Sequence, residues 1–302
     1  MPNMSPDKKR TGADSAQFFT VPIYAPRKVE FPSLKLSPHS VATFRECKQH
    51  YKFYYIDKLR DQYFRARPYF TMGNHVHATL REFLSHTPIE LRTSKTIEEL
   101  LRRNWRQCRI GFRNREDEKR WAEKALAQLE RFVEEQDIAV QPLMVETSLE
   151  AQITPQVILR GRVDRVDTEA DGSLHIIDYK TGNMPEEMDW SQLHLYALIL
   201  TRKLPYQVSR ASFHYLSAGA VQTIEIPTEM IEQTAWDLLV TAKDISTEKS
   251  FQPTPGAVCK HCDFGPICPA KQPGYTNEVD ADFELWRDCL NNGGSDTAGG
   301  DS

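Results

Sequence analysis

The pattern of apolar and polar residues divides the chain into a helical first part and a mixed second part. From residue 140 onward, apolar residues fall in short runs typical of strands, separated by turn signals such as Asp171-Gly172. The predicted strands span residues 140–153, 156–167, 174–180, 208–216 and 221–226. Helical spacing predicts one helix at residues 189–201, with Asp189 as its N-cap, and another at residues 229–243.

The first part of the chain carries apolar residues at helical spacing. The predicted helices span residues 36–59, opening at Ser37-Pro38, residues 73–84, and residues 97–135 with a break near Gly111. Helices followed by three strands, a helix, two strands and a helix predict an α/β fold class with a largely helical N-terminal part. The polar residues 1–32 are expected to form a flexible arm, and residues 276–302 a tail whose end is disordered.

Two acids and a lysine meet on the predicted hairpin of residues 161–182. Asp164 lies on its first strand and Asp178 on its second, and Lys180 projects from the same face as Asp178 because side chains alternate along a strand. Two carboxylates beside a cation suit a divalent metal and phosphodiester hydrolysis. The alternative is an exposed acid and a solvated strand end. The apolar run that carries Asp178 favours the metal site, because a buried charge is costly without a partner.

Composition limits the class of protein without choosing one. The 302 residues are 40% hydrophobic with a net charge of −4, which supports a real core and gives no overall signature of nucleic-acid binding. No apolar run is long enough to cross a bilayer and the N-terminus lacks an apolar signal core, so we expect a cytoplasmic protein with no membrane partner. Arginines crowd residues 102–115 around Trp105. Most should lie on a solvated helix face, and a few would suit phosphate contacts.

Clustered cysteines in an intracellular protein predict a metal site rather than disulfides. Cys259, Cys262 and Cys268 form a C-x2-C-x5-C pattern in a loop broken by glycine and proline. Three thiolates leave one ligand position open. The candidates for that position are Cys47, Cys108, Cys289 and, for zinc, His261. Zinc and an iron–sulfur cluster fit such a ligand set equally well.

Five motifs lie along the chain in a fixed order. They are LSPHSVATFRECKQHYKFYY with Cys47, the G-x-x-V-H of Gly73 to His77, the paired GRVD and IDYKTG, the Q-x-x-x-Y of Gln192 and Tyr196, and the terminal cysteine pattern. Together they resemble the RecB-like branch of the PD-(D/E)xK nuclease superfamily. The resemblance is to its iron–sulfur members, which include the AddB nuclease domain and the CRISPR-associated adaptation nucleases. Lys48 departs from that pattern, in which proline is usual after the first cysteine.

The resemblance implies a restriction-endonuclease-like fold, with a mixed central sheet flanked by helices and a C-terminal cysteine-rich loop. It also implies a Mg²⁺ or Mn²⁺ site. The implied ligands are His77, Asp164, Asp178 and the backbone carbonyl of Tyr179. Within its motif, His77 rather than His75 is the expected ligand. An upstream acid would contribute through a water, and both Glu146 and Glu150 qualify because alternation places them on one face of their strand.

The resemblance also implies catalytic and structural roles. With Asp164 and Asp178 on the metal, Lys180 would orient the attacking water or stabilise the developing negative charge. Gln192 and Tyr196 share a helix face and would position the lysine and the strand being cut, although by sequence alone packing and capping roles suit them equally. Cys47 would close a 4Fe–4S cluster, with zinc as the alternative, and so join the two ends of a single domain at residues 33–275.

These implications point to a metal-dependent DNA exonuclease acting on single strands or DNA ends, in repair, recombination or CRISPR-type adaptation. The chain contains no G-x-x-x-x-G-K-[ST] motif, so any motor would come from a helicase partner. The alternative is a non-catalytic DNA-end-binding or scaffold subunit of a helicase–nuclease complex. The intact set of Asp164, Asp178 and Lys180 argues against it.

Overall fold

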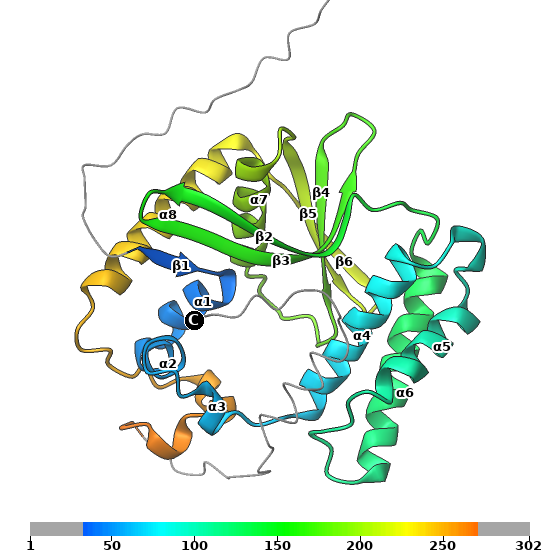
Figure 1. Ribbon diagram of the computed structural model, residues 1–302, viewed down its shortest axis with the longest axis horizontal. Coiled ribbons are helices and arrows are strands. Elements are labelled where there is room, and N and C mark those ends of the chain that lie inside the picture. Colours follow the sequence, from blue (N-terminus) through cyan, green and yellow to red (C-terminus); the bar gives the residue numbers. More distant parts are fainter. Residues whose placement is uncertain (1–32, 271–302) are drawn as a thin grey trace, which may run out of the picture. The chain divides into compact units, whose positions relative to one another are not determined.

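A mixed six-stranded sheet lies at the centre of the protein, with helices on both of its faces (Figure 1). The structure is a computed structural model and describes residues 33–270. The strands are β1 (Leu34–Leu36), β2 (Met144–Thr154), β3 (Val157–Thr168), β4 (Leu174–Lys180), β5 (Val208–Tyr215) and β6 (Ala220–Glu225). This architecture confirms the predicted α/β class with a mixed sheet. The expected N-terminal arm, the C-terminal tail and Cys289 lie outside the described residues.

The strand order is β2-β3-β4-β5-β6, with β1 also pairing with β3. Neighbours are antiparallel except for β1 with β3 and β4 with β5, which are parallel. The parallel pair β4 and β5 is joined by helix α7 (Ser191–Lys203), as a parallel connection requires a crossover. The chain therefore carries the end of β4 directly into α7, and this junction is where the site lies.

The helices form two groups. On one side lie α4 (Pro68–Ser85), α5 (Ser94–Trp105) and α6 (Arg115–Glu135), with a 3-10 turn at Ile89–Leu91. The others are α1 (Pro38–Glu46), α2 (Lys48–Tyr51), the π-helix Lys52–Ile56, α3 (Arg60–Tyr63), α7, α8 (Thr228–Thr247) and the 3-10 turns Ala257–His261 and Gly265–Ile267. Among the helices that the structure describes, none is long and apolar enough to span a bilayer.

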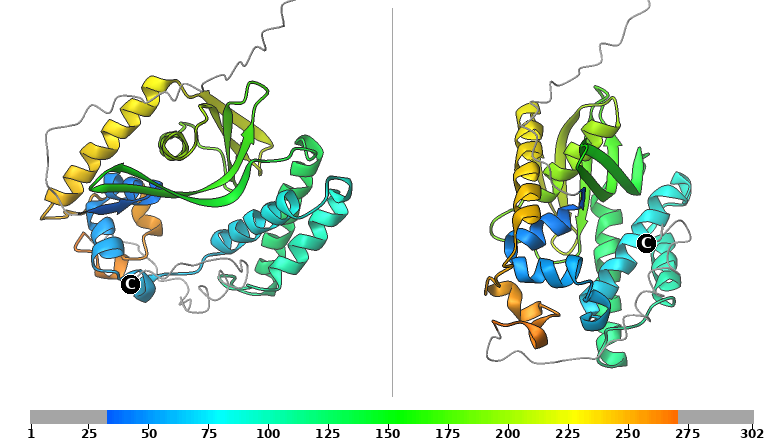
Figure 2. Two further views of the ribbon diagram at one scale, coloured as in Figure 1. Left: turned by 45° about the horizontal axis from the view of Figure 1, so that its top comes forward. Right: turned by 60° about the vertical axis from the view of Figure 1, so that its left-hand side comes forward.

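Each face of the sheet has its own hydrophobic core, and β4 contributes to both. Leu174 and Ile176 pack in the core shared with α1, α7 and α8. Ile177 and Tyr179 pack in the core formed with α4, α5 and α6. Figure 2 shows the sheet between these groups of helices. The alternation of β4 side chains thus sends one set to each layer, which explains its nearly continuous apolar sequence.

Several predicted boundaries are wrong for identifiable reasons. The helix expected at residues 36–59 ends at Cys47, whose backbone is extended, and continues as separate short helices. The helix expected from residue 73 begins at Pro68, which suits the first helical position. Trp190 rather than Asp189 is the N-cap residue of α7, although Asp189 Oδ1 accepts a hydrogen bond from Ser191 N (2.9 Å). The predicted break near Gly111 is confirmed, because this glycine has a φ of +86° between α5 and α6.

Candidate active site

The β3–β4 hairpin places the two predicted acids side by side. Arg165 pairs with Ile177 in an antiparallel register, so the preceding residue Asp164 lies opposite Asp178. Gly172, with a φ of +84°, closes the turn. Both carboxylates are buried, Asp178 with 3% of its surface exposed. The hairpin therefore holds two acids in the interior, where they require a partner.

Two glycines allow the flanking helices to approach this hairpin closely. A Cβ atom at Gly161 of β3 would lie 2.7 Å from Cε1 of Tyr196, so only glycine lets α7 pack here. A Cβ atom at Gly73 of α4 would lie 3.3 Å from Oγ1 of Thr181, just beyond β4. These contacts give a physical reason for the glycines of the G-R-V-D and G-x-x-V-H motifs. They bring α7 from one side and α4 from the other.

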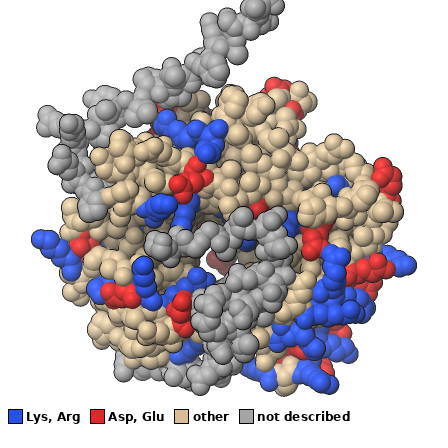
Figure 3. Space-filling model, in the orientation of Figure 1, with Lys and Arg blue, Asp and Glu red and all other residues tan. Residues whose placement is uncertain are grey.

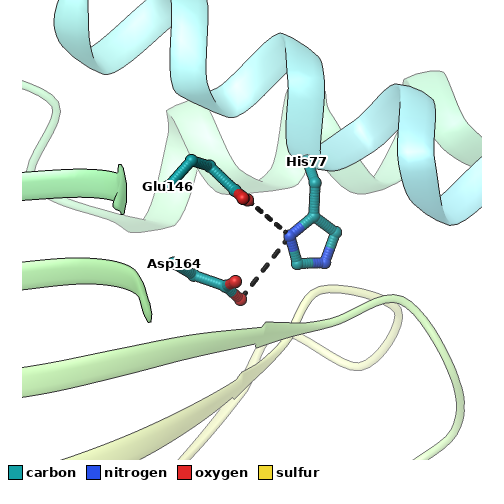
Figure 4. Close-up of side chains that lie close together, drawn as sticks. All are labelled: His77, Glu146 and Asp164. Carbon is teal, nitrogen blue, oxygen red and sulfur yellow. Dashed lines mark hydrogen bonds and ion pairs between the residues drawn. The ribbon is translucent and has the colours of Figure 1, made fainter. Parts of the chain in front are cut away.

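His77 on α4 points between two carboxylates (Figure 4). Its Nδ1 lies 2.9 Å from Oε1 of Glu146 and 3.5 Å from Oδ2 of Asp164. The three residues offer ligand atoms that all lie within 4.8 Å of one another. Carboxylate oxygens suit Mg²⁺, and an added imidazole shifts the preference toward Mn²⁺. The trio therefore forms a candidate site for a divalent cation.

Glu146 reaches the site because its backbone leaves the regular strand. It has a φ of +45°, and it lies between Val145 and Thr147, which pair with Arg165 and Val163. The pairing register is the same before and after Glu146, so Glu146 and Glu150 keep the same parity along β2, but their exposures differ. The Glu146 side chain is 5% exposed, whereas that of Glu150 is 50% exposed and lies 3.8 Å from Lys35. Of the two candidates, only Glu146 contacts the site.

The lysine and its neighbours form a continuous chain of polar contacts. Lys180 Nζ donates to Gln192 Oε1 (2.7 Å) and lies 2.6 Å from Oδ2 of Asp178. Gln192 Nε2 donates to Asp178 Oδ1 and to the Tyr196 hydroxyl, each at 3.0 Å. The amide of Gln192 thus holds the acid and the lysine together, and its own position depends on Tyr196. Asp178 lies outside the trio around His77 but one strand away from Asp164.

One buried oxygen in this network of Asp178, Lys180, Gln192 and Tyr196 lacks a well-formed hydrogen bond. Asp178 Oδ2 has no hydrogen bond of good geometry with a described residue, and its close contact is the ion pair with Lys180 at 2.6 Å. Tyr179 contributes its backbone N–H, which donates to Asp164 Oδ2 (2.8 Å). Lys180 is the cation beside this oxygen, and the nearby trio of His77, Glu146 and Asp164 offers carboxylate oxygens and an imidazole nitrogen as metal donors. The donor set thus fits a bound divalent metal.

The acids perturb one another strongly. Burial and the neighbouring charge of Asp164 raise the pKa of Asp178 to about 7. Burial acts against ionisation of Asp164 as well, but the charge and hydrogen bond of His77 lower the pKa of Asp164. Burial acts to lower the pKa of His77, yet Asp164 and Glu146 raise it well above its usual value. A cluster in which one carboxyl resists ionisation has an excess of negative charge that a cation would relieve.

Arg162 is a site residue that the sequence did not single out. Its Nε lies 2.9 Å from Glu146 Oε2, on the oxygen opposite the one that faces His77. The contact orients the Glu146 carboxylate so that its other oxygen faces His77. Arg162 follows Gly161 in the G-R-V-D motif, which was interpreted above only for Asp164. The same motif could therefore have indicated Arg162 as a site residue.

Four of the candidate cysteines, which are far apart in the sequence, lie around one pocket. Cys47, Cys259, Cys262 and Cys268 all line it. Backbone N–H groups of Thr254 and Gly256 donate to the sulfurs of Cys47 and Cys259 at 3.5 and 3.4 Å. Burial above all raises the pKa of Cys262 to about 11, with the nearby Cys268 and Cys47 acting in the same direction. The sulfurs therefore share one environment with hydrogen-bond donors already aimed at them.

The other described candidates for the fourth ligand position, Cys108 and His261, lie elsewhere. Cys108 and His261 do not line the pocket. The carbonyl of Cys108 lies 2.7 Å from His75 Nε2, in the helical layer of α4 and α5. The backbone carbonyl of His261 accepts a hydrogen bond from Arg67 (3.0 Å). Only Cys47 among the described candidates joins the three C-terminal cysteines.

Comparison with known proteins identifies the family. Residues 35–269 match the PD-(D/E)XK nuclease superfamily, which is most of the chain. The protein belongs to the PD-(D/E)XK nuclease superfamily. Its sheet, hairpin acids and Lys180 fit that membership. Nucleases of this superfamily use divalent metals such as Mg²⁺, for which the trio around His77 is a candidate site.

Two individual similarities are weaker than the family match. The chain is 29% identical over 120 residues to the Gene 69 protein of Mycobacterium phage D29, covering 37% of this chain and 43% of that protein. This PD-(D/E)XK protein thus spans less than half the length of that relative. The crystal structure of SSO0001 aligns with a TM-score of 0.39 and 15% identity, covering 79% of this chain and 87% of the other. A score this low carries no argument.

Proposed function

We propose that the protein is a Mg²⁺- or Mn²⁺-dependent DNA exonuclease that acts on single strands or DNA ends. The observation that carries the proposal is one arrangement of contacts. His77, Glu146 and Asp164 offer ligand atoms within 4.8 Å of one another, beside the chain of Asp178, Gln192 and Lys180. A cation site next to a positioned lysine is the equipment for attack on a phosphodiester.

The proposed ligands divide into three side chains already together and two groups close by. His77, Glu146 and Asp164 would hold the metal, with Asp178 and the Tyr179 carbonyl completing its shell. When bound, the metal polarises the scissile phosphate and lowers the pKa of a water molecule. Glu146 is oriented by Arg162, and Asp164 by the N–H of Tyr179. The protein thus fixes the ligands before the substrate arrives.

Lys180 is the proposed group that acts on the reacting atoms. Its ammonium is held by Gln192 and lies 4.7 Å from the centre of the Phe213 ring. In this position it would orient the attacking water or stabilise charge on the phosphate. Gln192 fixes the lysine, and Tyr196 fixes Gln192. We therefore assign Gln192 and Tyr196 as positioning residues.

We also propose that the cysteine pocket holds a 4Fe–4S cluster, as in the RecB-like iron–sulfur subgroup. Four sulfurs bound to one zinc ion at 2.3 Å would lie about 3.8 Å from each other. Among the described residues, no three of these cysteines bring their sulfurs within 4.8 Å of one another. The wider spacing around a shared pocket favours a multi-iron cluster over one zinc ion. Cys47 would then tie the end of α1 to the C-terminal loop.

The cellular setting proposed is repair, recombination or CRISPR-type adaptation, with a helicase as the partner that would supply movement along DNA. This part rests on the motif order and on the absence of a P-loop motif in the sequence. The competing proposal is a DNA-end-binding subunit without catalysis. The intact contacts of Lys180 favour the enzyme.

The proposal is tested by incubating end-labelled single- and double-stranded DNA with the protein and Mn²⁺. We expect cleavage that EDTA stops and that Asp178→Ala abolishes, while the visible absorbance of the cluster stays unchanged. Cleavage by Asp178→Ala at the wild-type rate would contradict the site assignment. End binding without any cleavage by the wild type would support the scaffold subunit. A colourless protein with stoichiometric zinc after anaerobic purification would overturn the cluster.

A further inference from the structure

A groove between α5 and α6 is not used by the proposed nuclease site. It encloses about 700 Å³. Apolar side chains that line it are the buried Leu101 and Trp105 and the half-buried Ala122 and Leu126, and charged ones are Glu98, Arg102, Arg106, Arg109, Arg115, Glu118, Lys119 and Glu123. Figure 3 shows basic side chains gathered at the lower right, over this part of the molecule. The groove thus has an apolar strip bordered by charge, as expected for binding an amphipathic helix.

Two of the five basic residues in the groove are unpaired. Arg102 pairs with Glu98, Arg109 with Glu118, and Lys119 with Glu123. Arg106 and Arg115 make no ion pair or hydrogen bond with any residue that the structure describes. Within the described part of the chain, the groove therefore has five basic and three acidic side chains, and Arg106 and Arg115 form no ion pair with any of the acids. An occupant should carry an apolar stripe and an excess of acid.

The chain's own C-terminal sequence has these properties. Its residues 278–290, EVDADFELWRDCL, lie outside the described part of the chain, and only their sequence is used. Val279, Phe283, Trp286 and Leu290 follow one another at spacings of four, three and four, which puts them on one face of a helix. Five acids and a single arginine occupy other positions. The sequence predicts an acidic amphipathic helix.

Described contacts bring the C-terminal loop close to the connection between α5 and α6. Arg67, just before α4, pairs with Asp263 of the C-terminal loop at 2.6 Å. A Cβ atom at Gly111, in the connection between α5 and α6, would lie 3.0 Å from the Arg67 backbone. One residue therefore contacts both the loop and the connection. The nine-residue step from Ala270 to Val279 can cover roughly 30 Å when extended.

We propose that residues 279–290 of the same chain dock as an amphipathic helix in the groove between α5 and α6. Phe283 and Trp286 would pack on the strip around Trp105, and the acids would face Arg106 and Arg115. A short tether gives an effective concentration of roughly millimolar, so an intrinsic affinity of about 100 µM leaves about nine molecules in ten docked. This docking is independent of the proposed nuclease function.

Hydrogen exchange of the full-length protein tests the docking. Phe283→Ser with Trp286→Ser should speed amide exchange in peptides of α5 and α6 by roughly tenfold, the ratio set by that occupancy. Leu285→Ser is the matched control, because Leu285 lies off the predicted apolar face and should leave exchange unchanged. The substituted residues lie beyond the family match at 35–269, and a single cooperative melting transition, lowered by no more than the few degrees that docking itself contributes, would verify that the domain core stays folded.

Charge reversal gives a second, independent reading. Arg106→Glu combined with Arg115→Glu should speed amide exchange in the same peptides of α5 and α6. High salt should speed that exchange in the wild type. Exchange that is equal in the wild type and Phe283→Ser/Trp286→Ser would overturn the proposal. Protection that appears only on adding single-stranded DNA would assign the groove to nucleic acid instead. Protection that rises with protein concentration would place a second copy's segment there and also contradict docking within one chain.

Discussion

The acids of the proposed nuclease site lie on adjacent strands, whereas the four cysteines come from opposite ends of the described chain. Asp164 and Asp178 face each other across one hairpin, and α4 and α7 add His77 and Gln192. The cysteine pocket instead joins the end of α1 to a loop roughly two hundred residues later. One region is built by strand register, and the other by closing a long loop.

The two regions are expected to have different roles, catalysis at the acids and stability at the cysteines. Asp178 is the unfavourable member of the site, because burial and the charge of Asp164 disfavour its charged state. The cysteines carry no reacting group, yet a bound cluster would restrain a long stretch of chain. Removing an acid should therefore abolish activity in a folded protein. Removing a cysteine should destabilise the fold, while the molecules that remain folded should cleave at nearly the wild-type rate.

The largest effect is expected for Asp164→Asn. It should lower the cleavage rate at least about 1000-fold, because a catalytic metal contributes several kcal/mol and 1.36 kcal/mol is tenfold in rate. Initial rates with Mn²⁺ on end-labelled DNA measure this. The iron content should equal that of the wild type. Loss of iron together with activity would show that the two regions are not separate.

Lys180→Met should have the next largest effect, a fall of about 100-fold in kcat with little change in Mn²⁺ binding. The substitution keeps the length of the side chain and removes the cation held by Gln192. Single-turnover cleavage and Mn²⁺ titration distinguish the two quantities. A variant that has lost metal binding but not its turnover per bound metal would refute the role given to the lysine.

Cys268→Ala should act mainly on stability. Losing one of four ligands should bleach the visible absorbance and lower the free energy of unfolding by about 3 kcal/mol, or roughly 5–10 °C in melting temperature. Cleavage by the protein that stays folded at low temperature should change by less than about threefold, a factor that corresponds to under 1 kcal/mol. Ala197→Gly, in the core of α7, is a control that destabilises the fold without touching the pocket. An intact absorbance in Cys268→Ala would contradict the ligand set.

The smallest effect concerns pH and belongs to the scaffold. Burial, with Arg165 and His175 nearby, lowers the pKa of His214 to about 3. The native state therefore binds fewer protons than the unfolded state, so stability is full above pH 6.5 and falls as the pH drops toward 3. The slope from one such group is about 1.4 kcal/mol per pH unit. His214→Gln should flatten the decline in melting temperature between pH 6.5 and 4.5, and an unchanged slope would contradict this.

Local rules in the sequence were sufficient for the hairpin. Register and alternation place Asp164, Asp178 and Lys180 without tertiary information, and the structure confirms their neighbourhood. The order of the major strands and helices follows from periodicity in the same way. The three residues of β1 were missed because they pair in parallel with distant β3 and have no pattern of their own.

Tertiary contacts decide what the sequence left open. Glu146 could not be separated from Glu150, because its positive φ accompanies contacts with His77 and Arg162 that no local pattern encodes. Cys47 could not be separated from Cys108 by the residues alone, because the choice depends on how the chain ends meet. In both cases a long-range contact selects between two chemically equal candidates.

The central claim, that the trio around His77 binds the metal used for cleavage, is tested most directly by Mn²⁺ binding to Glu146→Gln, with Glu150→Gln as the matched control. Electron paramagnetic resonance of free Mn²⁺ gives the affinity, and the same samples give the cleavage rate. Glu146→Gln should bind Mn²⁺ at least about tenfold more weakly and cleave more slowly, since an oriented ligand is lost. Glu150→Gln should match the wild type. Equal Mn²⁺ affinity in the two variants would contradict the claim.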